Sequence, residues 1–387
     1  MNIVLMNFDG VVNSFGGAAK VFIDMANSLA AKGHRVTLVT YESRTGLPAF
    51  HLEGKVTYRN CCGTIYEKLF HSEKIAKLKT CYLRDRKIRR IRRYQIELQS
   101  RRNSICSALE EIKPDVVVAF QQEVTYLLLE IIKTKIPVVT MLHNTPKYYF
   151  DRPEFEIFKP ALEKCSAVQV LMPEYINEAS QYLEQSKIVY IPNVVPQYTS
   201  HPTLKNAVIL NVAKISTRKR QHLIIEAFAQ VEKKYPNWTV ELWGWDKTEY
   251  ADKLKELIRR LHLDKKVKLC GETKAITEKY QNSSIFIFPS AFEGFSLALT
   301  EAMSIGLPVI GCRDCISIRG LIKHGVNGLL AESNPSDLAK QLEALMSSYE
   351  LRSALAINAQ KSMKDFSPEN IWQKWEELLI SVARTTD

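Results

Sequence analysis

The chain has 387 residues, of which 46% are hydrophobic and 25% are charged, and its formal net charge is +11. This length predicts two or three domains, each able to bury a core of its own. No apolar run approaches the roughly 18–20 residues of a membrane-spanning helix, and the opening MNIVLMNFDG lacks the basic region of a signal peptide. We therefore expect a globular protein in the cytoplasm.

The first half alternates short apolar runs with helical patterns. Six unalternated apolar runs are typical of parallel strands covered on both faces, at residues 3–6, 36–40, 116–120, 138–141, 168–171 and 188–191. Residues 18–32 form an amphipathic pattern followed by Gly33, a residue type that ends helices. Another helix is expected at 173–183, with a proline in its first turn. This rhythm predicts a doubly wound α/β domain over residues 1–195.

A strongly basic segment interrupts this half. Residues 74–102 carry twelve Lys or Arg side chains against Asp85 and Glu97, and their apolar residues recur at roughly helical spacing. The pattern predicts a long amphipathic helix or a helix pair. Three interpretations of this segment remain open: a charged face exposed to solvent, a surface that binds an anionic membrane, and a surface that binds an anionic ligand. Nucleic-acid binding is disfavoured, because few aromatic residues interleave with the charges. The candidate contact residues are Lys74, Lys77, Arg86, Lys87, Arg89, Arg90, Arg92 and Arg93.

A second α/β series follows a polar stretch at 195–203, which contains two prolines and predicts a linker. Strands are expected at 208–212, 239–243, 267–270, 285–289 and 308–311, and helices at 221–233, 251–261, 297–305 and 335–346. These elements predict a second domain over 204–367. Residues 368–384 form a final helix with one apolar stripe, and we expect the segment 368–387 to cross back to the first domain.

The most informative stretch is 285–310. A buried strand ends before Ser290, a loop carries Glu293, and a helix that contains Glu301 begins near Leu297. Open α/β sheets bind ligands at the carboxyl edge of the strands, and a helix N-terminus attracts phosphate. Carboxylates at such a place suit the hydroxyl groups of a sugar and a ribose.

Two lysines flank the first strand-to-helix turn of the second domain. Lys214 follows the strand and Lys219 precedes the helix, so both can neutralise a departing diphosphate. Spacing alone leaves open whether Arg218 or Arg220 shares this role. No metal site is predicted, because Cys312 and Cys315 form a single C-x-x-C pair that lacks further ligands.

These features resemble the retaining glycosyltransferases of family 4, the glycosyl transferases group 1, which have the GT-B fold. Glu293 and Glu301 match the family's E-x7-E element within EGFSLALTEAM. Lys214 and Lys219 match its Arg…Lys pair, with lysine at the first position where arginine is usual. The resemblance extends to Gly16-Gly17 and His143 in the first half, and it spans nearly the whole chain.

The resemblance implies two Rossmann-like domains that face each other across a cleft. It assigns the ribose to Glu301, the diphosphate to Lys214 and Lys219, and the donor sugar to Glu293. The other implied donor or catalytic residues are Gly16, Gly17, His143, Gly244, Phe295, Ser296 and Leu297. Neither a cofactor nor a metal is implied, because the nucleotide-sugar is a co-substrate, with UDP the most frequent nucleotide in the family.

The expected function is sugar transfer to a glycan or a lipid-linked glycan in cell-surface polysaccharide or lipopolysaccharide assembly, at the inner face of the membrane. Two alternatives remain. A sugar-nucleotide 2-epimerase also has two Rossmann-like domains and binds the same donors, but the spacing of Lys214, Lys219 and the EGFS…EAM stretch does not suit it. A non-catalytic adaptor would use only the basic segment to bind a membrane.

Overall fold

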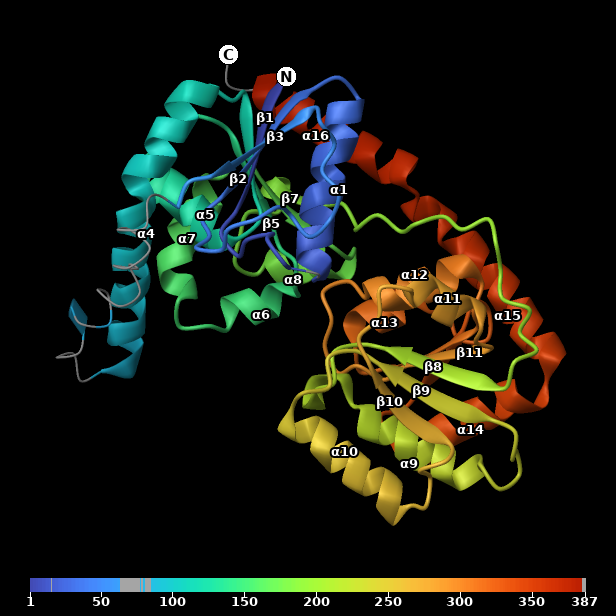
Figure 1. Cartoon of the computed structure of the whole chain (residues 1–387). Coiled ribbons are helices and arrows are strands. Elements are labelled where there is room, and N and C mark those ends of the chain that lie inside the picture. The colour runs from blue at the N-terminus through green and yellow to red at the C-terminus, as the bar shows by residue number, and fades with distance from the viewer. Residues whose placement is uncertain (15, 63–76, 78, 81–84, 385–387) are drawn as a thin grey trace. The chain divides into compact units, whose positions relative to one another are not determined.

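The structure is a computed structural model that describes residues 1–14, 16–62, 77, 79, 80 and 85–384. These residues form two compact units, Met1–Asn193 with Ile371–Asp387, and Val194–Asn370. Each unit has a parallel sheet with helices on its faces (Figure 1), which confirms the predicted α/β class with two Rossmann-like halves. The last helix is grouped with the first unit, although residues 368–370 at its start belong to the second.

The sheet of the first unit has seven parallel strands in the order β3-β2-β1-β4-β5-β6-β7. The strands are β1 (Asn2–Asn7), β2 (Arg35–Thr40), β3 (Val56–Asn60), β4 (Val116–Ala119), β5 (Val138–Met141), β6 (Ala167–Val170) and β7 (Ile188–Tyr190). Six of them lie on the predicted runs. The sequence did not predict β3, because VTYRN is a half-exposed edge strand without an apolar run. The order reverses between β1 and β4, which is where such sheets bind ligands.

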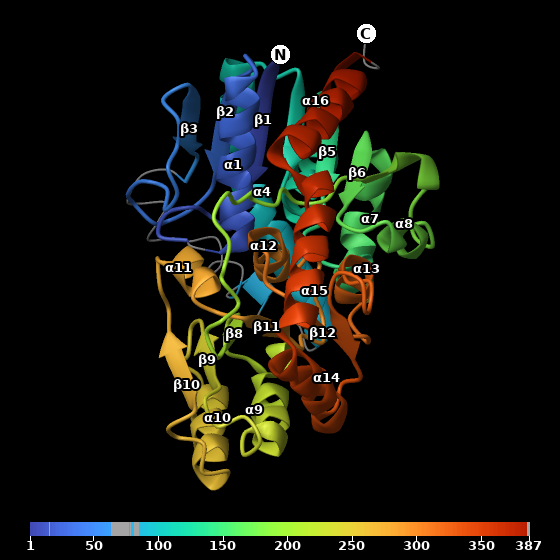
Figure 2. The ribbon, with the colours of Figure 1, turned by 90° about the vertical axis from the view of Figure 1, so that its right-hand side faces the viewer.

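Helices cover both faces of this sheet. They are α1 (Gly17–Ala31), α4 (Arg86–Ile112), α5 (Gln122–Tyr126), the π-helix η1 (Leu127–Ile132), α6 (Pro146–Phe150), α7 (Phe155–Lys164), α8 (Glu174–Ala179), the 3-10 turn η2 (Gln185–Lys187) and α16 (Pro368–Arg384). Figure 2 shows α1 and α16 in front of the strands and α4 behind them. The predicted helix at 173–183 is too long, because turns follow Ala179.

The C-terminal helix α16 packs on the first unit through a buried stripe that includes Ile371, Trp375 and Leu379. Its Glu376 accepts a hydrogen bond from Lys32 Nζ at 2.6 Å and pairs with His34 Nε2 at 2.9 Å. These two partners lower the pKa of Glu376, because both stabilise its charged form. The helix is therefore held by apolar burial and by one charged cluster.

The second unit has six parallel strands in the order β10-β9-β8-β11-β12-β13, which reverses between β8 and β11. The strands are β8 (Val208–Val212), β9 (Thr239–Trp243), β10 (Val267–Gly271), β11 (Ile285–Phe288), β12 (Val309–Cys312) and β13 (Leu329–Ala331). The helices are η3 (Thr217–Lys219), α9 (Gln221–Val231), α10 (Glu249–Arg260), α11 (Ile276–Gln281), α12 (Leu297–Ile305), α13 (Ile316–Leu321), α14 (Pro335–Ser347), α15 (Tyr349–Ser362) and η4 (Lys364–Phe366).

Two layers of helices enclose this second sheet. Figure 1 shows α9, α10 and α14 on one face and α11, α12 and α13 on the other. One apolar cluster joins β8–β13 to α9, α10 and α14, with Phe228, Ile287 and Leu342 among its fully buried side chains. Across the described ranges, no helix combines the length and apolar character needed to cross a bilayer.

Candidate active site

The switch point of the second sheet brings two predicted residues into contact. Lys219 Nζ forms an ion pair with Glu293 Oε1, and Ser290 Oγ donates a hydrogen bond to the same carboxylate. The side chains of Lys219 and Glu293 are only 13% and 11% exposed. The pair also lies against β11, since Lys219 Nζ is 5.0 Å from the centre of the Phe288 ring. A mostly buried cation thus lies at the carboxyl edge of the sheet.

Backbone contacts between two loops produce this pairing. The amide N–H of Ala291 donates to the carbonyl of Arg218 at 2.9 Å, which ties the loop after β11 to the turn η3. Arg220 follows in a left-handed conformation (φ 54°), and its side chain binds Asp314 at 2.7 Å and Ser333 at 2.9 Å. Arg220 is therefore occupied within the unit, whereas Arg218 and Lys214 are exposed.

The start of α12 offers backbone donors next to this pair. Ser296 precedes the helix without capping it through its side chain, so first-turn N–H groups remain for another partner. Its buried Oγ has no hydrogen-bond partner, while Phe295 packs against Phe366 with ring centres 5.8 Å apart. Leu297, the first helical residue, is half-buried. Such a helix start is suited to an anion or to sugar oxygens.

Glu301 lies within α12 among tyrosines that the sequence did not single out. Tyr280 Oη donates to Glu301 Oε2 at 3.3 Å. Burial raises the pKa of Tyr198 to about 12, and the nearby charge of Glu301 also raises it. The same two effects raise the pKa of Tyr280. Both phenols therefore stay protonated at neutral pH, and Tyr280 donates its hydrogen bond to Glu301.

Gly244 allows the ends of β8 and β9 to approach closely. Its φ is +146°, and a Cβ atom there would lie 2.0 Å from the carbonyl oxygen of Ala213. Only glycine fits this position without movement of the chain. The contact fixes the backbone directly before Lys214, and so it positions a predicted phosphate-binding residue.

In the first unit, a cavity of about 440 Å³ lies at the switch point of the sheet. Its lining includes Asn7 at the end of β1, Gln121 after β4 and His143 after β5. Ala18, in the first turn of α1, also lines it, so the cavity begins directly after Gly16 and Gly17. A Cβ atom on Gly16 would meet nothing within 4 Å, which leaves open space at this helix start.

The uncharged side chain of His143 forms part of the wall of this cavity. Its backbone N–H donates to Tyr149 Oη at 3.1 Å, and its ring centre is 5.1 Å from that of Phe120. Burial lowers the pKa of His143 to about 4, and its Nε2 atom is buried without a hydrogen-bond partner. At neutral pH the ring is therefore neutral, with one polar atom unsatisfied.

The comparisons with known proteins cover both units. The model described as Glycosyltransferase Family 4 matches residues 15–197, which contain His143 and most of the residues that line its cavity. The model described as Glycosyl transferases group 1 matches residues 199–362, which contain the Lys219–Glu293 pair. The chain belongs to glycosyltransferase family 4. The predicted family is thus confirmed, and the chain is a glycosyltransferase.

Relatives of this glycosyltransferase include proteins of similar length. An uncharacterized glycosyltransferase of Haemophilus influenzae is 24% identical and covers 95% of this chain and 97% of its own length. The GalNAc-α-(1→4)-GalNAc-α-(1→3)-diNAcBac-PP-undecaprenol α-1,4-N-acetyl-D-galactosaminyltransferase of Campylobacter jejuni is 22% identical and covers 95% of this chain and 96% of its own length.

Solved structures show the GT-B fold. Sucrose-phosphate synthase of Thermosynechococcus elongatus superimposes with a TM-score of 0.80 at 15% identity, over 99% of each chain. The Anabaena HepE protein in complex with UDP and glucose has a TM-score of 0.73 at 20% identity, over 98% of this chain and 100% of its own.

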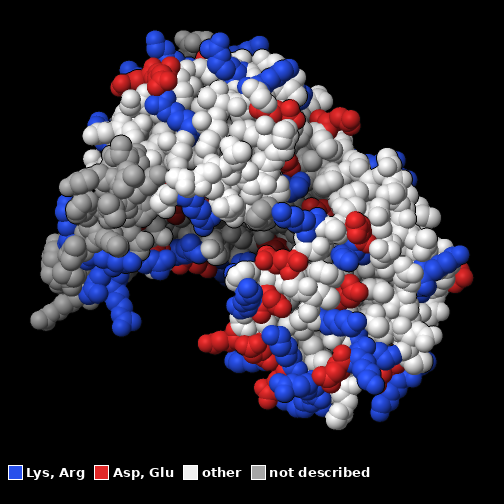
Figure 3. All heavy atoms as spheres, in the orientation of Figure 1, with Lys and Arg blue, Asp and Glu red and all other residues white. Residues whose placement is uncertain are grey.

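The basic residues of this glycosyltransferase occur in different surroundings. Lys74 and the side chain of Lys87 lie outside the described residues, whereas Lys77 is exposed. On α4, Arg86 and Arg92 are exposed, Arg89 and Arg93 are half-buried, and Arg90 forms an ion pair with the buried Glu154. Figure 3 shows Lys and Arg side chains gathered where the N-terminal half of α4 lies in Figure 1. One predicted contact residue, Arg90, thus has a structural partner.

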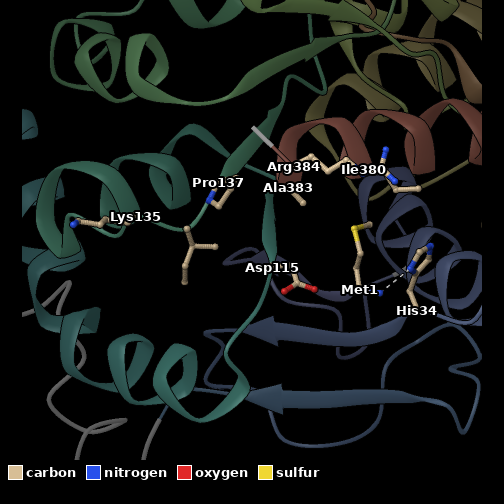
Figure 4. Close-up of a pocket in the computed structure, with 9 residues that line it drawn as sticks. Met1, His34, Asp115, Lys135, Pro137, Ile380, Ala383 and Arg384 are labelled. Atoms are coloured by element: carbon tan, nitrogen blue, oxygen red, sulfur yellow. Dashed lines mark hydrogen bonds between the residues drawn. The ribbon is translucent and has the colours of Figure 1, made fainter. Parts of the chain in front are cut away.

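A second cavity, of about 730 Å³, lies at the opposite, amino edge of the first sheet (Figure 4). Met1, His34 and Asp115 precede or begin β1, β2 and β4, while Ile380 and Arg384 belong to α16. No predicted site residue lines this cavity. The predicted donor and catalytic residues of both units lie instead toward the carboxyl edges.

No group of three or more His, Cys, Asp or Glu side chains with the geometry of a metal site occurs in the described part of the chain. Cys312 and Cys315 are buried free thiols, and burial raises the pKa of Cys312 to about 12. Such a thiol is protonated at neutral pH, which makes it a poor metal ligand.

The sequence missed several residues that shape the first cavity. Glu42 accepts hydrogen bonds from the backbone of Val11 at 2.9 Å and Val12 at 3.2 Å, and so it fixes the loop between β1 and α1. Arg101 and Glu123 line the cavity directly. Helical spacing could have identified Arg101. Leu98 lies three residues before it and Ile105 four residues after it, and both are buried, so Arg101 lies on the same face of the helix.

Proposed function

We propose that this chain is a retaining, metal-independent glycosyltransferase that moves a sugar from a nucleotide diphosphate, with UDP as the nucleotide, to a glycan or lipid-linked glycan. The Lys219–Glu293 pair beside the start of α12 is the observation that carries this proposal. The likeness to the HepE protein in complex with UDP and glucose supports the choice of nucleotide.

In this proposal, Lys219 exchanges partners when the donor binds. Its ammonium group turns from Glu293 to the diphosphate, which Lys214 and the N–H groups at the start of α12 also hold. Glu293 then accepts hydrogen bonds from hydroxyls of the donor sugar, next to the backbone of Phe295 and Ser296. Glu301 accepts hydrogen bonds from the ribose hydroxyls. Since these groups are fixed before the reaction, they stabilise the charge that develops on the leaving phosphate.

The proposed chemistry needs no protein nucleophile. The acceptor hydroxyl attacks the anomeric carbon on the face that the diphosphate leaves, and its proton passes to the departing phosphate oxygen. One carbon–oxygen bond forms while the bond to the diphosphate breaks, so the configuration at the anomeric carbon is retained. The family resemblance assigns the neutral His143 to the donor sugar, with Gly16 and Gly17 near the phosphates.

A thermal-shift screen of the full chain against UDP, GDP, ADP and their sugar conjugates tests the donor class. A ligand at about 100 times its dissociation constant adds roughly 2.7 kcal/mol to the stability of the folded state. We expect UDP compounds to stabilise the wild type and the Glu256→Ala variant, whose substituted residue is exposed on α10. We expect no such shift in Glu301→Ala. Stabilisation by none of the nucleotides would contradict the proposal and favour the basic adaptor.

We also propose that α4 holds the enzyme on the inner face of an anionic membrane. Arg86 and Arg92 are exposed, and each basic residue near an anionic surface contributes about 1 kcal/mol. Replacement of both by Gln should lower the affinity for phosphatidylglycerol vesicles, measured by co-sedimentation, by tenfold or more. The matched control is Lys253→Gln with Lys255→Gln on α10, which should bind as the wild type does. Equal binding by both double variants would contradict a role for α4.

A further inference from the structure

Two arginines contribute cationic side chains to the wall of the first cavity. Arg101 comes from α4, and its guanidinium lies over the rings of Phe8 at 4.7 Å and Tyr41 at 4.9 Å. Its Nε atom is buried without a hydrogen-bond partner. Arg152 follows α6 and lies over the ring of Tyr148 at 3.8 Å. Within the described ranges, neither guanidinium forms an ion pair.

Two acidic residues, Asp9 and Glu123, share this cavity with the arginines. Burial raises the pKa of Glu123 and the charge of Asp9 also raises it, whereas the charges of Arg152 and Arg101 lower it. Burial lowers the pKa of Arg101, but an arginine starts from so high a value that it remains a cation. The cavity therefore presents two guanidinium groups that stack on aromatic rings and, among the described residues, are not held in ion pairs, which favours an incoming negative charge.

Aromatic side chains form much of the remaining wall. Tyr94, Tyr148 and Tyr149 line the cavity together with Phe8 and Phe120. Aromatic faces bind the apolar face of a sugar ring, and their hydroxyl groups can bond to its oxygens. A guanidinium presents two parallel N–H donors, which match the oxygens of a phosphate or a carboxylate. The cavity thus combines features for a sugar ring and for an attached anion.

We infer that this cavity binds the acceptor of the transfer reaction and that Arg101 and Arg152 select an acceptor whose sugar carries an anionic group, a phosphate or a carboxylate. This inference rests on the proposed function, because it assigns the cavity to the acceptor of that reaction. It adds the chemical class of the acceptor and the two residues that recognise it. Tyr94 lies seven residues before Arg101 on the same face of α4, so one helix supplies both an aromatic and a cationic contact.

The test is calorimetric titration of the full chain in saturating UDP, which fills the donor site. The probes are N-acetylglucosamine 1-phosphate, glucuronic acid and the neutral methyl glycoside of N-acetylglucosamine. We expect at least one anionic sugar to bind tenfold or more tightly than the neutral one. Tighter binding of the phosphate assigns a sugar phosphate, which includes the head of a diphosphate-linked lipid, and tighter binding of glucuronic acid assigns an acidic sugar.

Variants then locate the binding. Arg101→Gln and Arg152→Gln should each lower the affinity for the anionic sugar by tenfold or more, to the level of the neutral sugar. The matched control is Arg102→Gln, since Arg102 is the next residue of α4 and is exposed. Arg101→Lys keeps the charge and the aliphatic stem, and thermal unfolding checks that each variant is folded.

Two results would overturn the inference: equal binding of neutral and anionic sugars by the wild type, or equal losses in Arg101→Gln and Arg102→Gln. Failure of the proposed function is a separate result. If UDP does not bind, the titrations are repeated without it, and a loss of anion binding specific to Arg101→Gln and Arg152→Gln still shows an anion site in the cavity.

Discussion

We propose two roles for Lys219. Its ion pair with Glu293 stabilises the fold, and its charge binds the diphosphate of the donor. Mutation can separate these roles. Lys219→Ala leaves the carboxylate of Glu293 mostly buried, with a hydrogen bond from Ser290 but without its cation. We expect a loss of about 2 kcal/mol in stability, because a buried charge has lost its counter-ion. We also expect a loss of at least 100-fold in sugar transfer.

The double variant Lys219→Ala with Glu293→Gln is the control for this prediction. It removes the uncompensated charge, so urea unfolding should show most of the stability restored. Transfer activity should stay low, because both the cation for the diphosphate and the carboxylate for the donor sugar are missing. Recovery of activity together with stability would show that the pair has only a structural role.

His143 should make stability depend on pH. Burial lowers its pKa from 6.5 to about 4, so the unfolded chain takes up a proton at a higher pH than the folded chain does. The stability that depends on the neutral ring is complete above about pH 6.5 and is lost progressively as the pH falls toward about pH 4. In His143→Gln, urea unfolding at about pH 7 and about pH 4.5 should therefore differ less than in the wild type.

His51 provides the control for the pH experiment, since its side chain is 82% exposed. His51→Gln should keep the pH dependence of the wild type. If His143→Gln kept it too, the histidine would not be held neutral by burial. That result would also weaken its assignment as an uncharged partner of the donor sugar.

At the scale of single elements, Gly244 at the end of β9 leaves no room for a side chain. Gly244→Ala would place a Cβ atom 2.0 Å from the Ala213 carbonyl oxygen, at a φ of +146°. Overpacking together with strain should cost about 3 kcal/mol in stability. Because the clash pushes on the residue before Lys214, the affinity for UDP should fall as well.

Gly271→Ala, at the end of β10, is the matched control for Gly244→Ala. Gly271 also has a positive φ, of +70°, but a Cβ atom there meets nothing within 4 Å. We expect a cost of only about 1 kcal/mol and unchanged affinity for UDP, measured by thermal unfolding and by titration. Equal effects of the two substitutions would contradict the steric role of Gly244.

Element prediction succeeded where apolar runs are continuous. The buried strands β1, β4, β8 and β11 were predicted because strands covered on both faces consist of such runs. The edge strand β3 and the helix α15 were not predicted, since the first is half-exposed and polar and the second lacks a strong apolar stripe. Their positions depend on the elements that they pack against.

The roles of the predicted site residues stay predictions, but the sequence placed those residues on the elements where the structure has them. Glu293 and Glu301 stand in one strand–loop–helix pattern and Lys219 in an earlier one, and the structure pairs Lys219 with Glu293 in the second unit. Arg101 and Arg102 are adjacent and chemically identical, yet only Arg101 lines the cavity. Charge alone did not distinguish them, because the difference comes from which face of α4 packs on the sheet.

At the scale of the whole molecule, the two units share one kind of sheet topology. Each sheet reverses its strand order, between β1 and β4 in one unit and between β8 and β11 in the other. Predicted residues lie at both reversals, with His143 near the first cavity and Lys219 beside β11. Because the proposed mechanism assigns roles to residues of both units, we expect activity only from the full chain.

Proton NMR of the full chain with the UDP-sugar that stabilises it most tests the central claim directly. Without an acceptor, water slowly takes its place, and the configuration of the first free sugar reports the mechanism. We predict that an α-linked donor releases the α anomer first, and that Glu301→Ala and Lys219→Ala release almost none. Release of the β anomer first would show inversion, and formation of a 2-epimer would show an isomerase; either result would contradict the account.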